Sequence, residues 1–308
     1  MQSVLPLPQS SSSAGNLRAC FFMVAAMAAF VVNDICTKLA LADANVAQIM
    51  AIRNLFSTLL LLGIAAFVGA LRSPAKLTSG TLTLRTLFDI GATISYIVAL
   101  GYMPLANASA IFQAMPLAVT LGAALFYRET VGWRRWTAIT VGFAGVLIIV
   151  RPGAEGFNIY SLYVLACVVF SAGRDLLTRR VPKGIPALMI SASTAAAVSL
   201  TGWLMIPFWG WEPLHGRDVA IMAVSSVAIA IGYICIVEAM RGGDIGFVSP
   251  FRYTILIFAI VFGLLIFDEV PDTATLIGAT IVVGSGGYSL YRERKRGRRT
   301  TMPRAQVH

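Results

Sequence analysis

Residues 247–269 read FVSPFRYTILIFAIVFGLLIFDE. This stretch is apolar over a length that can cross a bilayer as a helix, which needs about 20 residues. Near its start it carries Pro250, Arg252 and Tyr253, and it ends on two acidic residues. We therefore expect a membrane-spanning helix with an arginine a turn or more inside one end.

An earlier stretch repeats this pattern. Residues 107–129 read NASAIFQAMPLAVTLGAALFYRE and align with residues 247–269 without a gap, so that Glu129 falls on Glu269. Pro116 lies in the middle of the earlier stretch, where a missing backbone donor should kink the helix. The two glutamates are expected at helix ends, in water or among lipid headgroups. Two copies of one segment, 140 residues apart, indicate a duplicated protein.

A second pattern occurs at nearly the same spacing. Asp34 is followed four residues later by Lys38, and Asp175 is followed four residues later by Arg179. The two aspartates are 141 residues apart, and each motif also contains a threonine just before the base. The duplication therefore extends over most of the chain.

The composition places the chain in a membrane. Of its 308 residues 57% are hydrophobic and only 12% are charged, and the mean hydropathy is +0.79. A soluble domain carries about 25% charged residues. We predict an all-α polytopic protein of about ten transmembrane helices, near residues 17–40, 46–69, 84–102, 106–126, 133–150, 158–178, 186–206, 218–239, 246–266 and 274–291.

An odd number of spans in each half reverses the direction of the second half. Five spans per repeat predict an inverted repeat, an architecture of many secondary transporters, whose substrate site lies near the midplane. The expected parts of the chain are a disordered cytoplasmic N-terminus (1–16), a first repeat (17–150), a second repeat (158–291) and a basic cytoplasmic tail (292–308).

The distribution of charge predicts the orientation. Most of the 24 lysines and arginines fall at the N-terminus, in the even-numbered loops and in the tail, whereas the odd-numbered loops hold only Arg151 and Arg217. By the positive-inside rule both termini are cytoplasmic, in the inner (plasma) membrane. The net charge of +10 could suggest nucleic-acid binding, but a juxtamembrane basic tail is instead expected to contact anionic lipid headgroups.

Other chemistries find little support in the sequence. The four cysteines lie in apolar runs without paired spacing, so we expect no disulfide framework, metal site or cofactor. No Walker loop is present, and ATP-driven transport within this chain is therefore unsupported. The remote alternative is a membrane-embedded lipid-modifying enzyme, but no cluster of carboxylates or histidines suited to catalysis occurs. A non-transporting scaffold is a third alternative.

The residues resemble the drug/metabolite transporter superfamily, EamA type. The resemblance covers about residues 17–291 and rests on the ten spans, the Ser249–Tyr253 motif SPFRY and the glutamates that end equivalent helices. It implies secondary transport of a small organic metabolite by alternating access. Asp34, Lys38, Arg53 and Arg252 look most similar to the branch that contains riboflavin and S-adenosylmethionine importers. Riboflavin uptake is the substrate prediction, with S-adenosylmethionine, amino acids or other metabolites, in either direction, as alternatives.

Charged residues inside the spans are the candidate site, because a charge at the bilayer centre costs roughly 2.5–3.5 kcal/mol on insertion scales. Arg53 and Arg252 are expected to contact the substrate, since a guanidinium binds planar acceptors with two donors. Asp34, Asp89 and Glu238 are candidate counter-ions, and structural ion pairs between spans are the alternative. The predicted substrate-binding set is Arg53, Asp89, Tyr96, Gln113, Glu238, Arg252 and Tyr253.

The two four-residue pairs suggest gates. Asp34 with Lys38, and Asp175 with Arg179, can each share a helix face, and such a pair either gates transport or is a plain ion pair at a helix end. Proton coupling through Asp34, Asp89 or Glu238 and facilitated diffusion both fit the sequence, as do a monomer and a homodimer.

Overall fold

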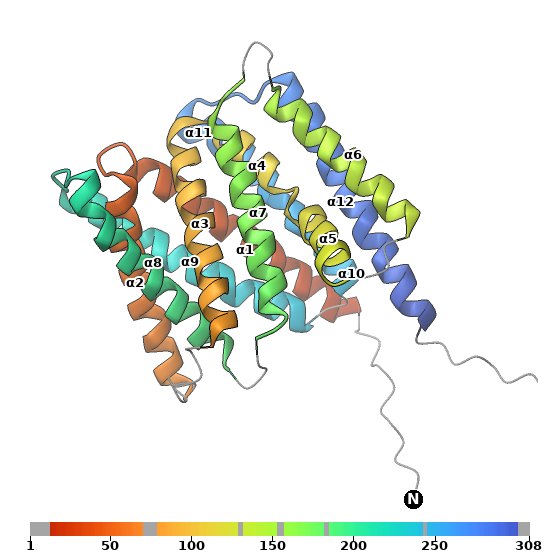
Figure 1. The fold of residues 1–308 in the computed structure, drawn as a ribbon, viewed down its shortest axis with the longest axis horizontal. Helices are drawn as coiled ribbons and strands as arrows, with labels where there is room; N and C mark the ends of the chain where they lie inside the picture. The colour runs from red at the N-terminus through yellow and green to blue at the C-terminus, as the bar shows by residue number, and fades with distance from the viewer. Residues whose placement is uncertain are drawn as a thin grey trace, which may run out of the picture.

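The structure is a computed structural model that describes residues 13–69, 79–128, 132–152, 157–181, 185–242 and 245–300. The described part of the chain forms helices joined by turns and loops, and none of its residues forms a strand (Figure 1). Its helices are α1 (Ser13–Ala40), α2 (Val46–Phe67), α3 (Gly80–Tyr102), α4 (Leu105–Phe112), α5 (Met115–Phe126), α6 (Trp133–Val150), α7 (Tyr160–Thr178), α8 (Ala187–Trp209), α9 (Gly216–Gly242), α10 (Ile245–Val248), the 3-10 helix η2 (Ser249–Tyr253), α11 (Thr254–Phe267) and α12 (Thr273–Thr300).

Nine segments of the described chain are long and apolar enough to cross a membrane, with α4 and α5 counted as one. Helix α12 adds the tenth predicted span and continues to Thr300, into the segment that we expected to be a tail. The predicted N-terminal segment 1–16 lies mostly outside the described residues, and α1 already begins at Ser13. The prediction of an all-α polytopic fold is confirmed.

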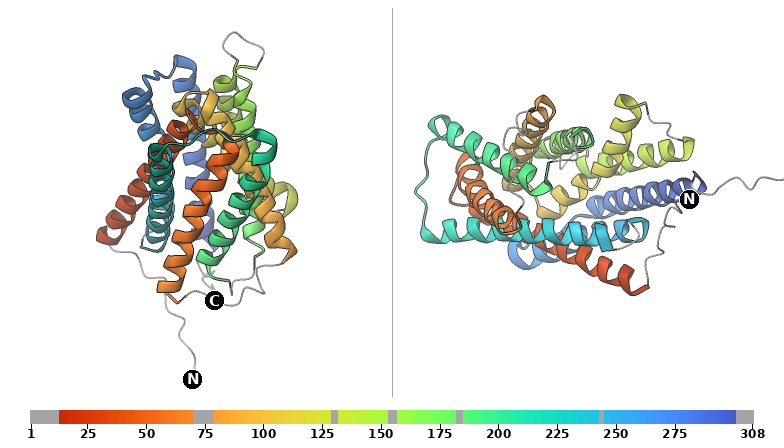
Figure 2. Two further views of the ribbon diagram at one scale, coloured as in Figure 1. Left: turned by 90° about the vertical axis from the view of Figure 1, so that its left-hand side faces the viewer. Right: turned by 90° about the horizontal axis from the view of Figure 1, so that it is seen from below.

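The two halves run in opposite directions. The chain enters α1 and leaves α12 at one end of the bundle, which we call the proximal end (Figures 1 and 2). Helix α1 therefore ends at the opposite, distal end, whereas its repeat equivalent α7 starts at the distal end and ends at the proximal end. This reversal is the predicted inverted repeat.

Helix pairing follows the same symmetry. The most extensive contacts join α1 to α9, α2 to α8, α3 to α7 and α6 to α12. Each pair takes one helix from each half of the chain. Exchanging the halves turns the first pair into the third and leaves the other two unchanged, so the core is an interface between the repeats.

Two glycine contacts show the symmetry at the level of side chains. In α3, Gly91 faces the ring of Phe170 on α7, and in α9, Gly232 faces the ring of Phe30 on α1. The glycines are 141 residues apart and the phenylalanines 140 apart, so the two contacts are equivalent. Small residues let helices approach closely in membranes. Gly91 is thus used for packing inside the bundle.

Gly202 brings α8 directly against the backbone of α2. A Cβ placed on Gly202 would lie 2.4 Å from the amide nitrogen of Ala51 and 2.7 Å from the carbonyl oxygen of Ala47. Gly202→Ala should therefore lower stability by about 1–3 kcal/mol, because backbone atoms cannot move aside as a flexible side chain can. Thermal unfolding in detergent measures this effect. Gly63→Ala is the matched control, since nothing lies within 4 Å of that Cβ, and an equal loss in both variants would contradict the explanation.

Candidate translocation site

Two of the membrane-spanning segments are broken, and the breaks are equivalent. The fourth span stops at Phe112 and restarts at Met115, while the ninth passes through the 3-10 helix η2 before α11 begins at Thr254. At the repeat offset of 140 residues, Gln113 corresponds to Tyr253. Interrupted helices at corresponding positions of the two halves mark the binding site in inverted-repeat transporters.

The chemistry of proline explains the first break. Pro116 has no N–H to donate to the carbonyl of Phe112, four residues earlier, and α4 ends at that residue. Pro116 then lies within the first turn of α5, where the missing donor costs nothing. In the ninth span Pro250 opens η2 in the same tolerated position. The sequence predicted a kink at Pro116 but did not reveal that the two breaks match.

Polar atoms without partners lie beside both breaks. Among the described residues, the side-chain atoms Asn107 Oδ1, Gln113 Nε2 and Tyr253 Oη are buried and have no hydrogen-bond partner. Tyr253 is 9% exposed. A buried polar group without a partner costs about 1–3 kcal/mol, so a ligand that pairs with these atoms would recover that cost.

A buried cluster surrounds Asp34 in the distal half of the bundle. The hydroxyl of Tyr96 donates to Asp34 Oδ2 at 2.9 Å, and the amide of Asn33 donates to Asp34 Oδ1 at 3.0 Å. Arg53 Nη1 donates to Thr37 Oγ1 at 3.1 Å and to Asn33 Oδ1 at 3.4 Å. Asp34 is thus the nearby opposite charge for a buried guanidinium, as the sequence suggested.

The second half of the chain supports this cluster through α9. Ser225 Oγ donates to Asn33 Oδ1 at 2.8 Å, and Ser226 Oγ donates to the backbone carbonyl of Arg53 at 2.7 Å. Both serines are buried. Sequence analysis did not select Asn33 or the serines, because uncharged polar residues in a span give no signal until their contacts are known.

A second cluster lies in the proximal half. Arg174 Nη1 is 2.7 Å from Asp89 Oδ1, and Arg174 Nε is 2.9 Å from Asp175 Oδ1. Nearby on α3, Arg85 donates to the hydroxyls of Thr178 and Thr194 at 2.9 and 2.8 Å. Asp175 is the repeat equivalent of Asp34, so each half contributes one such aspartate to a polar cluster.

Arg252 is the unpaired cation of this region. Its guanidinium makes no hydrogen bond or ion pair with any residue that the structure describes, and its electrostatic neighbours are Asp175, Arg174 and Tyr253. The side chain is exposed. Arg252 can therefore offer its full fork of donors to an incoming group.

The distal end of the bundle is closed by a contact between the halves. Lys38, in the last turn of α1, forms an ion pair with Glu269, which follows α11, and also donates to the carbonyl of Met103 at 2.8 Å. Glu269 Oε2 in turn accepts from the backbone N–H of Leu105 at the start of α4, at 2.8 Å. The Lys38 ammonium also lies 5.0 Å from the centre of the Phe267 ring.

These contacts change the pairing that the sequence suggested. Lys38 pairs with Glu269 rather than with Asp34, and Asp175 forms an ion pair with its neighbour Arg174. The four-residue rule considers one helix only, whereas Lys38 finds its partner in the other half of the chain. Glu269 is also mostly buried in this contact, and is not an exposed helix end as we expected.

The remaining predicted residues differ in their surroundings. Tyr96 packs against Phe112, with ring centres 5.5 Å apart. Glu238 is exposed on α9 and has no hydrogen bond or ion pair with a residue whose side chain the structure describes. Arg179 is exposed at the proximal end of α7. Glu129 lies outside the described residues.

A second contact joins the halves at the distal end. Arg151, after α6, pairs with Asp272, before α12, and Asp272 also accepts from the Thr275 backbone at 2.8 Å. Burial raises the pKa of Asp272, but the hydrogen bonds from Thr275 and Arg151 outweigh burial and lower the pKa below its ordinary value. The pair stabilises the fold at neutral pH, and this contribution disappears as the pH falls through the lowered pKa.

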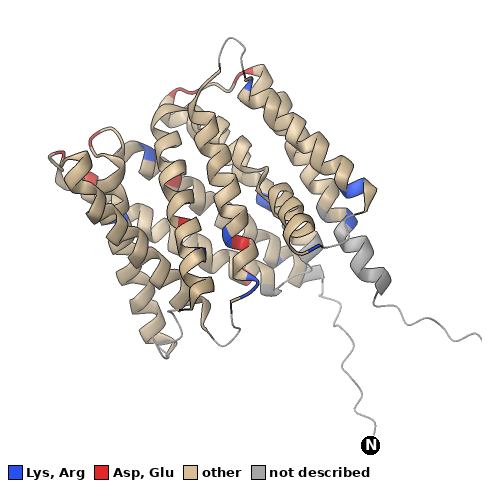
Figure 3. Ribbon diagram, in the orientation of Figure 1, with Lys and Arg blue, Asp and Glu red and all other residues tan. Residues whose placement is uncertain are grey.

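Charged residues occupy only a small part of the ribbon (Figure 3). A bundle of two inverted repeats, with broken helices and paired charges inside an apolar exterior, has the architecture of a secondary transporter. The chain belongs to the EamA-like transporter family, whose model matches residues 17–151 and 158–286.

Several relatives are named as transporters. An S-adenosylmethionine uptake transporter of Rickettsia bellii is 26% identical over 85% of this chain and 90% of its own length. A riboflavin transporter of Vibrio cholerae is 29% identical over 70% of this chain and 73% of its own. A pseudopaline exporter of Pseudomonas aeruginosa is 26% identical over 82% and 89%. A crystal structure with 16% identity covers 92% of this chain and 100% of its own, with a TM-score of 0.61, which shows the fold alone.

The family and the names of these relatives identify a membrane transporter of small molecules. The alternative of a membrane-embedded enzyme is therefore discarded.

Proposed function

We propose that this chain takes up a small organic metabolite by alternating access of a site between its two repeats. The observation that best supports this proposal is the pair of equivalent helix breaks. Beside these breaks lie side-chain polar atoms of Gln113 and Tyr253 that have no hydrogen-bond partner among the described residues. These atoms and the Arg252 fork offer donors and acceptors to a polar ligand. Arg53, Asp89 and Tyr96 hold the surrounding clusters in place.

The distal and proximal ends of the bundle differ in how tightly they are closed, and this difference supports one particular state of the alternating-access cycle. At the distal end Lys38 and Glu269 join the halves, and Asp34 and Arg53 behind them are 7% and 8% exposed. Towards the proximal end Arg252 is exposed, and the Asp175 side chain retains 40% exposure. We infer a state closed distally and open proximally, with Lys38 and Glu269 as the distal gate.

The charge pattern supports an orientation for this state. The positive-inside rule predicts that both termini are cytoplasmic. Because the chain enters α1 and leaves α12 at the proximal end, that end then faces the cytoplasm. The open side is then the side on which an imported metabolite leaves. Asp34 or Asp89 could carry a proton, and uptake would then be coupled to proton entry. The proposed site is formed by residues of a single chain, so the proposal needs no second copy.

The proposed substrate carries a planar heteroaromatic ring with several hydrogen-bonding groups. Riboflavin, the substrate predicted from the sequence, presents a row of carbonyl and N–H groups that suits the unpaired Arg252 fork and the amide of Gln113. S-adenosylmethionine is the second candidate, favoured because the relatives named for its uptake align over 85–90% of this chain.

Uptake of radiolabelled riboflavin and S-adenosylmethionine into cells that lack their own importers tests this proposal. Arg252→Lys should raise the KM for the true substrate by about tenfold, since an ammonium keeps the charge but loses the two-donor fork. Arg217→Lys, at the exposed distal end of α9, is the matched control. Unchanged KM in Arg252→Lys would contradict the proposed role of the fork, and absence of saturable uptake of both compounds would reject both substrates.

A further inference from the structure

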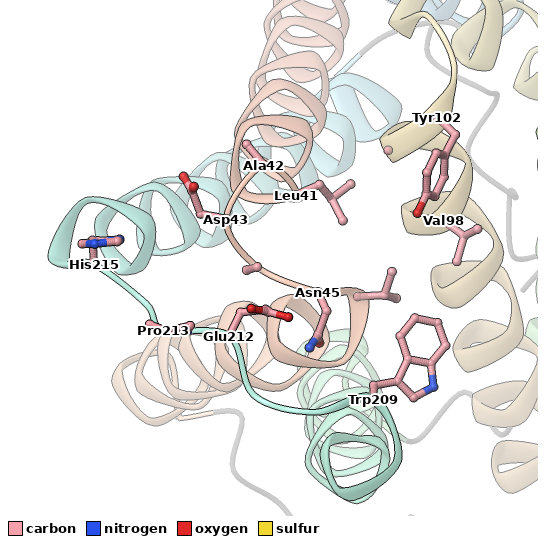
Figure 4. Close-up of a pocket in the computed structure, with 13 residues that line it drawn as sticks. Leu41, Ala42, Asp43, Asn45, Val98, Tyr102, Trp209, Glu212, Pro213 and His215 are labelled. Carbon is pink, nitrogen blue, oxygen red and sulfur yellow. The ribbon is translucent and has the colours of Figure 1, made fainter.

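A pocket of about 660 Å³ opens at the distal end, outside the Lys38–Glu269 closure (Figure 4). It lies between the α1–α2 turn, the end of α3 and the α8–α9 loop. Cavities of about 300–1,000 Å³ hold small organic ligands. Its walls are formed by Leu41, Ala42, Asp43, Ala44, Asn45, Val46, Val98, Gly101, Tyr102, Trp209, Glu212, Pro213 and His215.

The walls are fixed by hydrogen bonds that begin with a helix cap. Asn45 and Gln48 form a capping box at the start of α2. Each also donates to the α8–α9 loop, Asn45 to the carbonyl of Gly210 at 3.0 Å and Gln48 to the carbonyl of Glu212 at 2.8 Å. The loop that forms one wall of the pocket is thereby fastened to the start of α2.

The pocket carries negative charge without compensation. Asp43 and Glu212 both line it, and no lysine or arginine does. Neither carboxylate has a hydrogen bond or ion pair with a residue in the described part of the chain. The lining His215 lies 3.5 Å from a carboxylate of its own, that of Asp218. The Glu212 side chain points towards Asn45 (Figure 4). An organic cation entering here would meet an unpaired carboxylate.

Aromatic rings form the opposite wall. Tyr102 and Trp209 lie on the same side of the pocket (Figure 4). Tyr102 is held by stacking on Tyr160, with ring centres 4.2 Å apart and planes 11° apart. Such rings stack on planar groups and attract cations through their faces.

We propose that this pocket is an external capture site for an organic cation that carries a planar ring. The pocket adjoins the gate, since Leu41 follows Lys38 by three residues and Tyr102 precedes Met103, whose carbonyl accepts from Lys38. A ligand bound here lies beside the Lys38–Glu269 ion pair, which must break before the ligand can enter the bundle. Its role in uptake rests on the proposed function, and it favours a sulfonium compound such as S-adenosylmethionine over uncharged riboflavin.

The test uses two ligands that differ by one charge. S-adenosylhomocysteine lacks the sulfonium methyl group of S-adenosylmethionine and its positive charge but keeps the adenine ring. In the purified protein, Trp133, Trp136, Trp203 and Trp211 are replaced by phenylalanine, so that Trp209 is the only tryptophan emitter. Both ligands should quench Trp209, with S-adenosylmethionine binding about tenfold more tightly.

Glu212→Gln should reduce that preference to about twofold or less. Asp268→Asn, which removes a distal negative charge outside the pocket, should keep it. Absence of quenching, equal affinities in the parent protein, or an unchanged preference in Glu212→Gln would overturn the capture site. Charge-selective quenching without uptake of S-adenosylmethionine would support the pocket and reject transport of that compound, so the two proposals fail separately.

Discussion

Asp34→Ala should reduce uptake per protein molecule to near the level of cells without the transporter. The substitution leaves the buried Arg53 without its nearby opposite charge and removes the acceptor of the Tyr96 hydroxyl. Removing one member of a buried charge pair costs about 3–5 kcal/mol when the partners touch. Asp34 acts on Arg53 partly through Asn33, so we expect about 3 kcal/mol of lost stability, measured by thermal unfolding in detergent.

A graded series separates charge from hydrogen bonding. Tyr96→Phe removes one hydroxyl but keeps the ring packed on Phe112, so its cost should be about 1 kcal/mol. Asp268→Asn is the control, because it removes an exposed carboxylate elsewhere, and asparagine tolerates the positive φ of 53° at that position. If Asp34→Ala matched Asp268→Asn in uptake and stability, the buried cluster would have no functional part.

Reversing either charge of the distal gate should have the second large effect. Lys38→Glu places two carboxylates together, and Glu269→Lys places two ammonium groups together. Like charges in contact cost several kcal/mol. Either single variant should therefore fail to close the distal end, and initial uptake rates should fall by at least about tenfold.

The double variant Lys38→Glu, Glu269→Lys restores opposite charges and should recover part of the uptake. Recovery is incomplete because Glu269 also accepts from the N–H of Leu105, which a lysine cannot do. Initial rates for the four proteins, normalised to protein in the membrane, form a double-mutant cycle. Additive losses, with no recovery in the double variant, would show that the two charges do not act on each other.

Much of the fold followed from the sequence because its signals are local or periodic. Apolar length gave the spans, the odd number of spans gave the inversion, and the repeated segment that ends in Glu269 gave the duplication. The charges inside spans also indicated Arg53, Asp89 and Arg252. Such residues stand out because bare charge is costly in a bilayer.

The site was less predictable, because its contacts come from distant segments. Lys38 finds Glu269 across 231 residues, whereas a helical spacing rule points to Asp34. The breaks in the fourth and ninth spans are equivalent, at Gln113 and Tyr253, although the prolines near them are not at equivalent positions. Pro116 follows its break and removes the donor to the carbonyl of Phe112, whereas Pro250 lies in the first turn of η2, before Tyr253. Uncharged serines of α9 complete the Asp34 cluster and carry no signal in the sequence.

The most direct test of alternating access locks the distal gate covalently. A Lys38→Cys, Glu269→Cys variant is joined by a short, reducible bifunctional thiol reagent and reconstituted in liposomes, after Cys20, Cys36, Cys167 and Cys235 are replaced by alanine. Entry of the substrate found in the cell assay should fall to that of protein-free liposomes and return, when the link is reduced, to the rate of the untreated double-cysteine variant. The reagent should leave the rate of either single-cysteine variant unchanged. Full entry through the linked protein would contradict a gate at Lys38 and Glu269.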